Sequence, residues 1–301
     1  MAPGWISRAL GGRTPTSDSE RDRDALLLGA IAARQVAELG ALDGLHDAEF
    51  RVFSQFGDDG IINYLVDRLQ PDSQVFVEFG VEDYRESNTR FLMMHRNWAG
   101  LVMDGSDENI RRLRAWPEFW KFDLQAKAAF IDRENINDLI ASSGVSGEIG
   151  VLHIDIDGND FWVWERLDVV DPVIAVVEFN SVFGRDRPIA TPYDPVFDRS
   201  KAHHSNLYWG ASLPALAHLA HSKGYAFVGC NSAGNNAYFV RRNCIGNGVR
   251  EVSVADGYVL SRYRESRDRA GQLTYVAGDG RLEAIRGMPV VNVVTMSEEL
   301  L

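Results

Sequence analysis

The chain has 301 residues, of which 45% are hydrophobic and 25% are charged, as in an ordinary globular protein. That length fits one large domain or two small ones. A formal net charge of -12 disfavours general nucleic-acid binding, which needs a basic face, and attachment to an anionic membrane surface. The two cysteines, Cys230 and Cys244, lack metal-site spacing and do not indicate a disulfide scaffold, so we expect a reducing, cytoplasmic setting.

The N-terminal part is predicted in two pieces. Residues 1–20 are rich in Gly, Pro, Ser and Thr, and we expect them to be disordered. Residues 21–52 form a predicted N-terminal helical extension, with helical periodicity over 21–40. The first residues lack the apolar segment of a secretory signal, and no run in the chain reaches the roughly 18 apolar residues that a membrane span needs.

Residues 53–245 predict a domain of alternating helices and strands. The strands are nearly all apolar, which is typical of a parallel sheet with helices on both faces. We expect helices at 53–69, 88–95, 106–114, 127–142, 161–167 and 211–223, and strands at 75–80, 99–104, 119–124, 148–157 and 173–180.

A hairpin over 225–241 is expected to close this sheet, and residues 246–301 are expected to pack on the core as a C-terminal extension. The predicted fold class is therefore α/β. We expect a Rossmann-like, doubly wound, mixed seven-stranded sheet with a C-terminal antiparallel hairpin, preceded by N-terminal helices.

The turn after the first strand carries the clearest ligand signal. The strand ends in Glu78-Phe79-Gly80, and Gly80 has no Cβ to keep a ligand away from the backbone. Asp104 ends the second strand, where nucleotide-binding folds hold the two hydroxyls of a ribose. The chain has neither the dinucleotide fingerprint after the first strand nor a Walker A sequence.

The same turn is acidic, because it holds Glu82, Asp83 and Glu86. An acidic turn suits a cationic ligand that lacks a pyrophosphate. S-adenosylmethionine, which carries a sulfonium and an ammonium group, meets that description. The alternative is that these carboxylates cap the next helix and interact favourably with its dipole.

With these motifs in the predicted order of elements, residues 53–245 resemble the class I S-adenosylmethionine-dependent methyltransferases. Within that class they look like the FkbM-like and related sugar O-methyltransferases of bacterial glycan and natural-product pathways. The likeness rests on Val77-Glu78-Phe79-Gly80, Ser87-Asn88-Thr89, Leu101-Val102-Met103-Asp104-Gly105 and Ile154-Asp155-Ile156-Asp157-Gly158. These motifs are more specific for the fold than for the acceptor, and the usual glycine-rich first loop keeps only Gly80 here.

The resemblance implies a donor site. Glu78 and Gly80 would face the methionine part of S-adenosylmethionine, and Asp104 would hold the ribose. Asp123 would lie near the adenine, although it could equally cap a helix. The predicted donor-binding residues are Glu78, Gly80, Glu82, Ser87, Asn88, Asp104, Gly105 and Asp123.

Acidic residues gather at two further strand ends. Asp155 and Asp157 lie two residues apart and share a face of the extended chain, Asp160 follows them, and Glu178 and Asn180 end the next strand. Such strand ends meet in one crevice, and hard oxygen ligands suit Mg²⁺ or another divalent cation. We predict a metal held by Asp155 or Asp157 with Glu178 and Asn180, which would chelate a vicinal diol as in some related sugar methyltransferases. The alternative is that these acids cap helices and pair with arginines.

A sugar hydroxyl is a poor nucleophile at neutral pH, so a base or a metal ion must help it react. Asp155 and Asp157 are candidate catalytic residues. His203 and His204 are further base candidates, since imidazole titrates near neutral pH and their long loop, 181–206, is a candidate lid. His153 lies within a strand, which favours a core role.

Four aromatic residues complete the list of candidates. Trp162 and Trp164 are predicted to belong to the core. Tyr208 and Trp209 precede a glycine turn and are predicted to contact the acceptor, because aromatic rings stack on sugars.

The predicted function is S-adenosylmethionine-dependent O-methylation of a sugar hydroxyl in a glycan or sugar-containing metabolite, with metal assistance left open. The alternative is a non-catalytic protein of methyltransferase fold that binds a metabolite or supports a glycan assembly complex. The missing dinucleotide fingerprint disfavours an NAD-dependent sugar-modifying enzyme. A protein or phenol acceptor, and a homo-oligomer, remain open.

Overall fold

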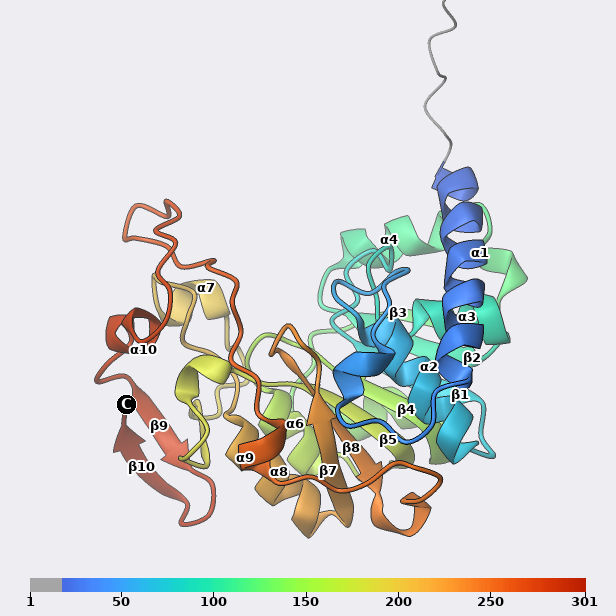
Figure 1. Cartoon of the computed structure of the whole chain (residues 1–301). Coiled ribbons are helices and arrows are strands. Elements are labelled where there is room, and N and C mark those ends of the chain that lie inside the picture. The colour runs from blue at the N-terminus through green and yellow to red at the C-terminus, as the bar shows by residue number, and fades with distance from the viewer. Residues whose placement is uncertain (1–17) are drawn as a thin grey trace, which may run out of the picture.

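The computed structural model describes residues 18–301, which surround a seven-stranded sheet (Figure 1). The strand order is β3-β2-β1-β4-β5-β8-β7; the first five strands of the chain run parallel, and β8 is antiparallel to both of its neighbours. The strands are β1 (Val75–Phe79), β2 (Ala99–Asp104), β3 (Leu124–Ala128), β4 (Gly147–Ile154), β5 (Val170–Glu178), β7 (Tyr225–Cys230) and β8 (Asn236–Arg241). This topology confirms the predicted Rossmann-like mixed sheet with its antiparallel hairpin.

Helices cover both faces of the sheet, because successive strand side chains point to opposite sides and nearly all of them are apolar. Val77 and Phe79 belong to the core under α5, α6 and α8, whereas Phe76 belongs to the core under α2, α3 and α4. The longer helices are α1 (Asp18–Ala37), α2 (Asp58–Leu69), α3 (Arg90–Arg96), α4 (Asp107–Arg114), α5 (Ile136–Ala141), α6 (Asp160–Arg166) and α8 (Leu213–Ser222).

A small antiparallel sheet lies at the end of the molecule opposite α1 (Figure 1). It joins β6 (Ile189–Ala190), from the predicted long loop, to β9 (Pro289–Asn292) and β10 (Ser297–Leu300) of the C-terminal extension. The short helices are η2 (Leu45–Ala48), η3 (Phe119–Lys121), η4 (Ser181–Phe183), α7 (Arg199–Ala202), η5 (Arg242–Cys244), α9 (Val254–Gly257) and α10 (Gly280–Ala284).

Three element predictions were wrong. The helix predicted over 53–69 begins only at Asp58, where α2 starts. Residues 119–124 do not form the third strand: η3 forms there, with Trp116 stacked on Phe122 at a ring distance of 5.4 Å, and the strand begins at Leu124. The helix predicted over 127–142 is reduced to α5, because β3 extends through Ala128 and a turn follows it.

The N-terminal prediction is also altered. α1 begins at Asp18, so the last three residues of the segment predicted to be disordered are helical, and residues 1–17 lie outside the described part of the chain. Within residues 18–301, no helix combines the length and the apolar character that crossing a membrane would require.

Candidate active site

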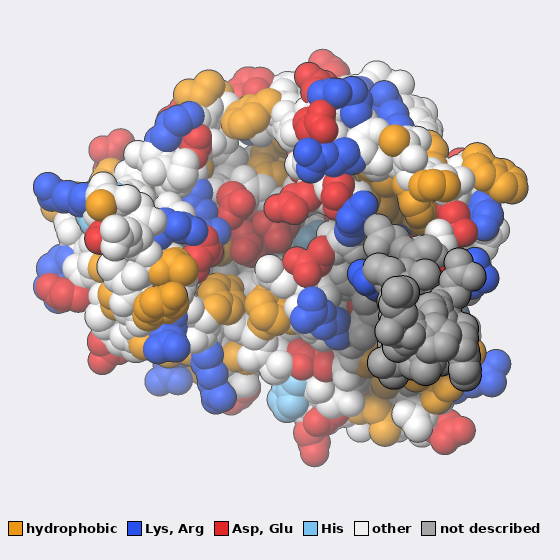
Figure 2. All heavy atoms as spheres, turned by 90° about the horizontal axis from the view of Figure 1, so that it is seen from above, with side chains coloured by type: hydrophobic (Ala, Val, Ile, Leu, Met, Phe, Trp, Pro, Cys, Tyr) orange, Lys and Arg blue, Asp and Glu red, His pale blue; other side chains and the backbone are white. Residues whose placement is uncertain are grey.

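A cavity of about 600 Å³ opens at the carboxyl ends of the parallel strands. It lies where the strand order reverses between β1 and β4, which is the usual ligand position in doubly wound sheets. Acidic side chains gather in a hollow near the middle of the face shown in Figure 2. Among the described residues, the cavity is lined by one arginine, Arg199, and by nine acids: Asp58, Glu78, Glu82, Glu86, Asp104, Asp155, Asp157, Glu178 and Glu265. The charge of the lining favours ligands that carry positive charge or hydrogen-bond donors.

Glu78, at the end of β1, holds the turn that leads to α3. Its buried carboxylate accepts hydrogen bonds from Ser87 Oγ at 2.6 Å, from Asn88 N at 2.9 Å and from Thr89. It also lies 3.2 Å from Nδ1 of His153, whose Nε2 meets Asn88 Nδ2 at 2.8 Å. The predicted donor residues Glu78, Ser87 and Asn88 therefore line the cavity as one hydrogen-bonded unit.

Glu78 and His153 are a buried pair that is ionic when the imidazole is protonated. Burial opposes the charge on each group, but the hydrogen bond and the opposite charge of the partner outweigh it. The pKa of Glu78 is therefore lowered, and the pKa of His153 is raised. The predicted core role of His153 agrees with this burial, although the residue also borders the cavity.

Gly80 has a left-handed backbone, with φ of 73°. A Cβ at this position would lie 1.7 Å from the backbone oxygen of Asp155. The space left by the missing Cβ of Gly80, which was expected to receive a ligand, is therefore occupied by the backbone that follows β4. Its role is to let the two strands that bound the cavity lie against each other.

Asp104, at the end of β2, is already bonded to the protein. Its Oδ2 accepts from Glu82 N at 2.8 Å, and its Oδ1 accepts from Ser106 N at 2.8 Å and from Asn109 Nδ2 at 3.1 Å. Glu82 is exposed and has a positive φ of 47°. Glu82 and Asp104 line the cavity together with Gly105, and partial desolvation, followed by the charge of Asp104, raises the pKa of Glu82.

Asp123 does not reach the cavity, contrary to the prediction. It precedes β3, at the amino end of the strand, and its backbone oxygen accepts a hydrogen bond from Gly100 at the start of β2. The misplaced strand boundary caused the error. The residues that follow β3 and line the cavity are Ala129, Phe130 and Ile131.

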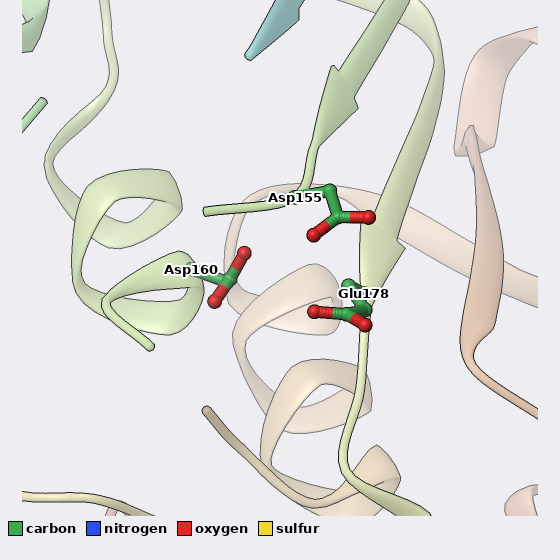
Figure 3. A group of neighbouring side chains, drawn as sticks. All are labelled: Asp155, Asp160 and Glu178. Atoms are coloured by element: carbon green, nitrogen blue, oxygen red, sulfur yellow. The ribbon is translucent and has the colours of Figure 1, made fainter. Parts of the chain in front are cut away.

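Three carboxylates converge between β4, β5 and α6 (Figure 3). Asp155, Asp160 and Glu178 each place one oxygen within 4.8 Å of the others. Burial, then the charge of Asp157, raises the pKa of Asp155 to about 6; burial, then the charge of Asp155, raises the pKa of Asp160 to about 7. The pKa of Glu178 is raised well above its usual value by burial and by Asp155. We call these three residues the carboxylate cluster.

The cluster differs in two members from the predicted metal ligands. Asp157 is exposed and forms an ion pair at 2.8 Å with Arg199. Asn180 is buried and fully used, since its Nδ2 donates to Leu207 O and Trp209 O and its Oδ1 accepts from Val182 N. Asp160, rather than Asn180, is the third member of the cluster. Its two oxygens accept hydrogen bonds from Ile156 N and Gly158 N.

His203 and His204 are not among the cavity residues. Nδ1 of His203 contacts Ser205 Oγ at 2.7 Å, and the two imidazole rings lie 4.2 Å apart. Burial, then the charge of His204, lowers the pKa of His203. The structure does not bring the predicted histidine bases to the carboxylate cluster.

The structure agrees only in part with the roles predicted for the four aromatic candidates. Trp162 and Trp164 are buried in the core. Trp209 lines the cavity beneath the guanidinium of Arg199, which lies 4.8 Å from its ring. Tyr208 instead gives its hydroxyl to the backbone oxygen of Pro289.

Several cavity residues were missed in the sequence. No site role was predicted for Asp58, Asn235 or Asn236, although the Asn-rich turn of the predicted hairpin is a polar signal. Tyr263 and Glu265 lie in the irregular C-terminal extension. No periodicity marks them, since only tertiary contacts bring that segment to the sheet.

Neither a scan against protein-family models nor a search of curated proteins finds a match for this chain. Similar solved structures include an O-methyltransferase from Bacillus cereus in complex with SAH, with 12% identity, a TM-score of 0.41 and coverage of 78% of this chain and 94% of that chain. The N-terminal domain of EvdMO1 with SAH bound has 11% identity, a TM-score of 0.40 and coverage of 76% and 98%. A putative RNA methyltransferase, PH1948 from Pyrococcus horikoshii, has 6% identity, a TM-score of 0.39 and coverage of 71% and 96%. At these values the fold assignment rests on the strand order described above.

Proposed function

We propose that this chain is an S-adenosylmethionine-dependent O-methyltransferase that acts on a sugar hydroxyl, with the help of a divalent cation. The observation that carries the proposal is one cavity that joins two acidic regions at the switch point of the sheet. The region at β1 and β2 holds Glu82 and Asp104, and the region at β4 and β5 holds Asp155 and Glu178, which Asp160 joins from behind the lining to form the carboxylate cluster. We further propose that residues 53–245 are the methyltransferase domain and that the enzyme works in the cytoplasm.

The first region suits the donor. Carboxylates of Glu82 and Asp104 beside an open Gly105 favour hydroxyl groups of a ribose, which can donate to them. The adenine would lie beside Ala129, Phe130 and Ile131 rather than beside Asp123. The sulfonium and ammonium charges of S-adenosylmethionine fit the acidic lining, whereas a pyrophosphate would be repelled by it.

The second region suits the reaction. In methyl transfer the acceptor oxygen bonds to the methyl carbon while the carbon–sulfur bond breaks, and its electron pair stays on the sulfur of the product SAH. The hydroxyl proton must go to a nearby base. With a pKa raised to about 6, Asp155 is ionised at neutral pH and can accept that proton.

The carboxylate cluster also fits a divalent cation. Its three carboxylates have raised pKa values and can each offer one oxygen to the same ion. A cation held by Asp155, Asp160 and Glu178 would polarise an acceptor hydroxyl and lower its pKa.

Calorimetric titration with S-adenosylmethionine, with and without Mg²⁺, tests the proposal. We expect saturable binding with one site per chain, weakened by Glu82→Gln and retained by Tyr275→Ala, since Tyr275 is exposed and does not line the cavity. SAH release from a panel of sugar acceptors should then follow and should decrease after chelation. If the wild-type protein binds no S-adenosylmethionine under any condition, the proposed function is wrong. If it binds but turns over no acceptor, the non-catalytic alternative is favoured.

A further inference from the structure

Several residues of the cavity keep a buried oxygen that has no hydrogen-bond partner among residues 18–301. Asp58 Oδ2, Asn159 Oδ1, Glu178 Oε2 and Asn236 Oδ1 are in this state. Each side chain is more than nine-tenths buried. All four atoms are hydrogen-bond acceptors, and an unpaired buried acceptor is costly. A ligand that satisfies them must bring donors, such as hydroxyl or ammonium groups, whereas phosphate oxygens are themselves acceptors.

Three of these residues form one corner of the cavity, which we call the acceptor corner: Asp58, Glu178 and Asn236. Glu178 at the end of β5 pairs in register with Asn236 at the start of β8. Asn236 Nδ2 donates to Asp58 Oδ1 at 2.9 Å. The corner belongs to the β5 and β8 side of the sheet, so it is separate from Gly80 and Asp104 on the proposed donor side.

The C-terminal extension adds Tyr263 to the lining of the same cavity. Its ring stacks on Phe56 at a distance of 5.8 Å and an angle of 12°. Tyr263 lines the same cavity as Asp155 and Glu178, and burial, followed by the charge of Glu178, raises the pKa of its phenol. A ring at this position offers a sugar an apolar face beside a row of acceptors.

Tyr263 is held in place by a buried polar knot two residues earlier. Ser261 Oγ accepts from Ser181 Oγ at 2.7 Å, and Arg281 donates to Ser261 Oγ at 2.8 Å and to Ser261 O at 2.7 Å. Arg281 is only 3% exposed. The knot ties the extension to the segment after β5, so the position of Tyr263 is fixed by the fold.

We propose that the acceptor corner and Tyr263 bind the non-reacting part of a sugar that carries no phosphate, and that they bind amine-bearing sugars in preference to neutral ones. The proposal rests on the proposed function and adds the substrate class. Hydroxyl and ammonium groups supply the missing donors, and the ammonium also suits a cavity whose lining has nine acids and one arginine. A sugar phosphate brings acceptors and negative charge, and both disfavour it.

Three probes of nearly the same shape test this preference: D-glucosamine, D-glucose and D-glucose 6-phosphate. Saturation-transfer NMR on the full chain, in the presence of SAH and Mg²⁺, measures their relative binding. We expect glucosamine to bind more tightly than glucose and glucose 6-phosphate to bind least. Tyr263→Ala should weaken glucosamine binding at least tenfold, and Tyr263→Phe should restore most of it. Tyr275→Ala, an exposed tyrosine of the same extension, is the matched control and should leave binding unchanged.

The same samples separate this proposal from the proposed function. S-adenosylmethionine affinity, measured by calorimetry, should be the same in the wild type and in Tyr263→Ala. Retained donor binding together with tighter binding of glucose 6-phosphate, or with no sugar binding at all, would overturn the substrate class and leave the proposed function standing. Loss of donor binding in the wild type would overturn the proposed function instead. An equal loss of sugar binding in Tyr275→Ala would contradict a specific role for Tyr263.

Discussion

The acidic side chains on the two sides of the cavity differ in their hydrogen bonding and in the direction of their pKa shifts. On the β1 and β2 side, Glu78 and Asp104 each accept several protein hydrogen bonds, and Glu78 has a lowered pKa. On the β4 and β5 side, Asp155 and Glu178 have raised pKa values, and Glu178 keeps an oxygen without a partner. Glu78, whose charge the protein stabilises, holds the turn after β1, whereas Glu178 keeps a buried oxygen that a ligand can use.

Gly80→Ala should have the largest effect, because it disrupts the packing of the strand ends on the β1 side of the cavity. The new Cβ would overlap the backbone oxygen of Asp155, and alanine is strained at a φ of 73°. We expect a loss of about 3 kcal/mol or more in the free energy of unfolding, together with loss of donor binding, measured by urea denaturation and calorimetry. Gly105→Ala is the matched control: its nearest atom, on Phe130, lies 3.6 Å from the added Cβ, so stability should change by about 0.5 kcal/mol at most. Equal losses in both variants would refute the packing role of Gly80.

Asp155→Asn and Glu178→Gln should mainly affect turnover. Each removes a proposed proton acceptor or metal ligand while it keeps the shape of the side chain. We expect SAH formation to slow by about 10² to 10⁴, with donor affinity within a factor of three or so of the wild type. Asp157→Asn is the control, since Asp157 is exposed and paired with Arg199, and should cost less than about tenfold. If the control were as slow as the two variants, the cluster would not be the reactive group.

The pH dependence of stability should reveal the raised pKa values of Asp155 and Asp160 on the β4 and β5 side of the cavity. Free aspartates ionise near pH 4, whereas in the folded chain the pKa of Asp155 is about 6 and that of Asp160 is about 7. The folded state therefore binds more protons in this window, and its stability should fall as pH rises from about 4 to 7. We expect the Tm of the metal-free protein to be lower at pH 8 than at pH 5.5. Mg²⁺ should reduce the difference, and a Tm that rises over the same range would contradict the raised pKa values.

The smallest effect is expected outside the cavity. His203 and His204 were candidate bases, but the structure places neither beside the cluster. The double variant His203→Ala/His204→Ala should keep turnover within about twofold of the wild type in a steady-state assay. A tenfold loss would mean that the loop closes over the cavity during the reaction.

The sheet was predictable because its strands are apolar runs bounded by clear turns, and the ends of β1, β2, β4 and β5 followed from them. Asp104 and Asp155 were therefore found at the cavity. Where the local signal was weak, the prediction failed: β3 alternates Leu124 and Ala126 with polar residues, and its shifted boundary misplaced Asp123. Asn180 was assigned to a metal, although backbone oxygens of Leu207 and Trp209, distant in sequence, take up its amide.

Tyr263 and Glu265 line one side of the cavity, and their position late in the chain affects the order of folding during synthesis. During synthesis, the sheet can be complete once β8 has left the ribosome, but the cavity still lacks one side. The hydrogen bonds between Ser181, Ser261 and Arg281 hold that side in place, and they need the chain as far as Arg281. The sheet can thus be complete at a shorter chain length than the cavity. A nascent chain can therefore be compact while its cavity is still open to water.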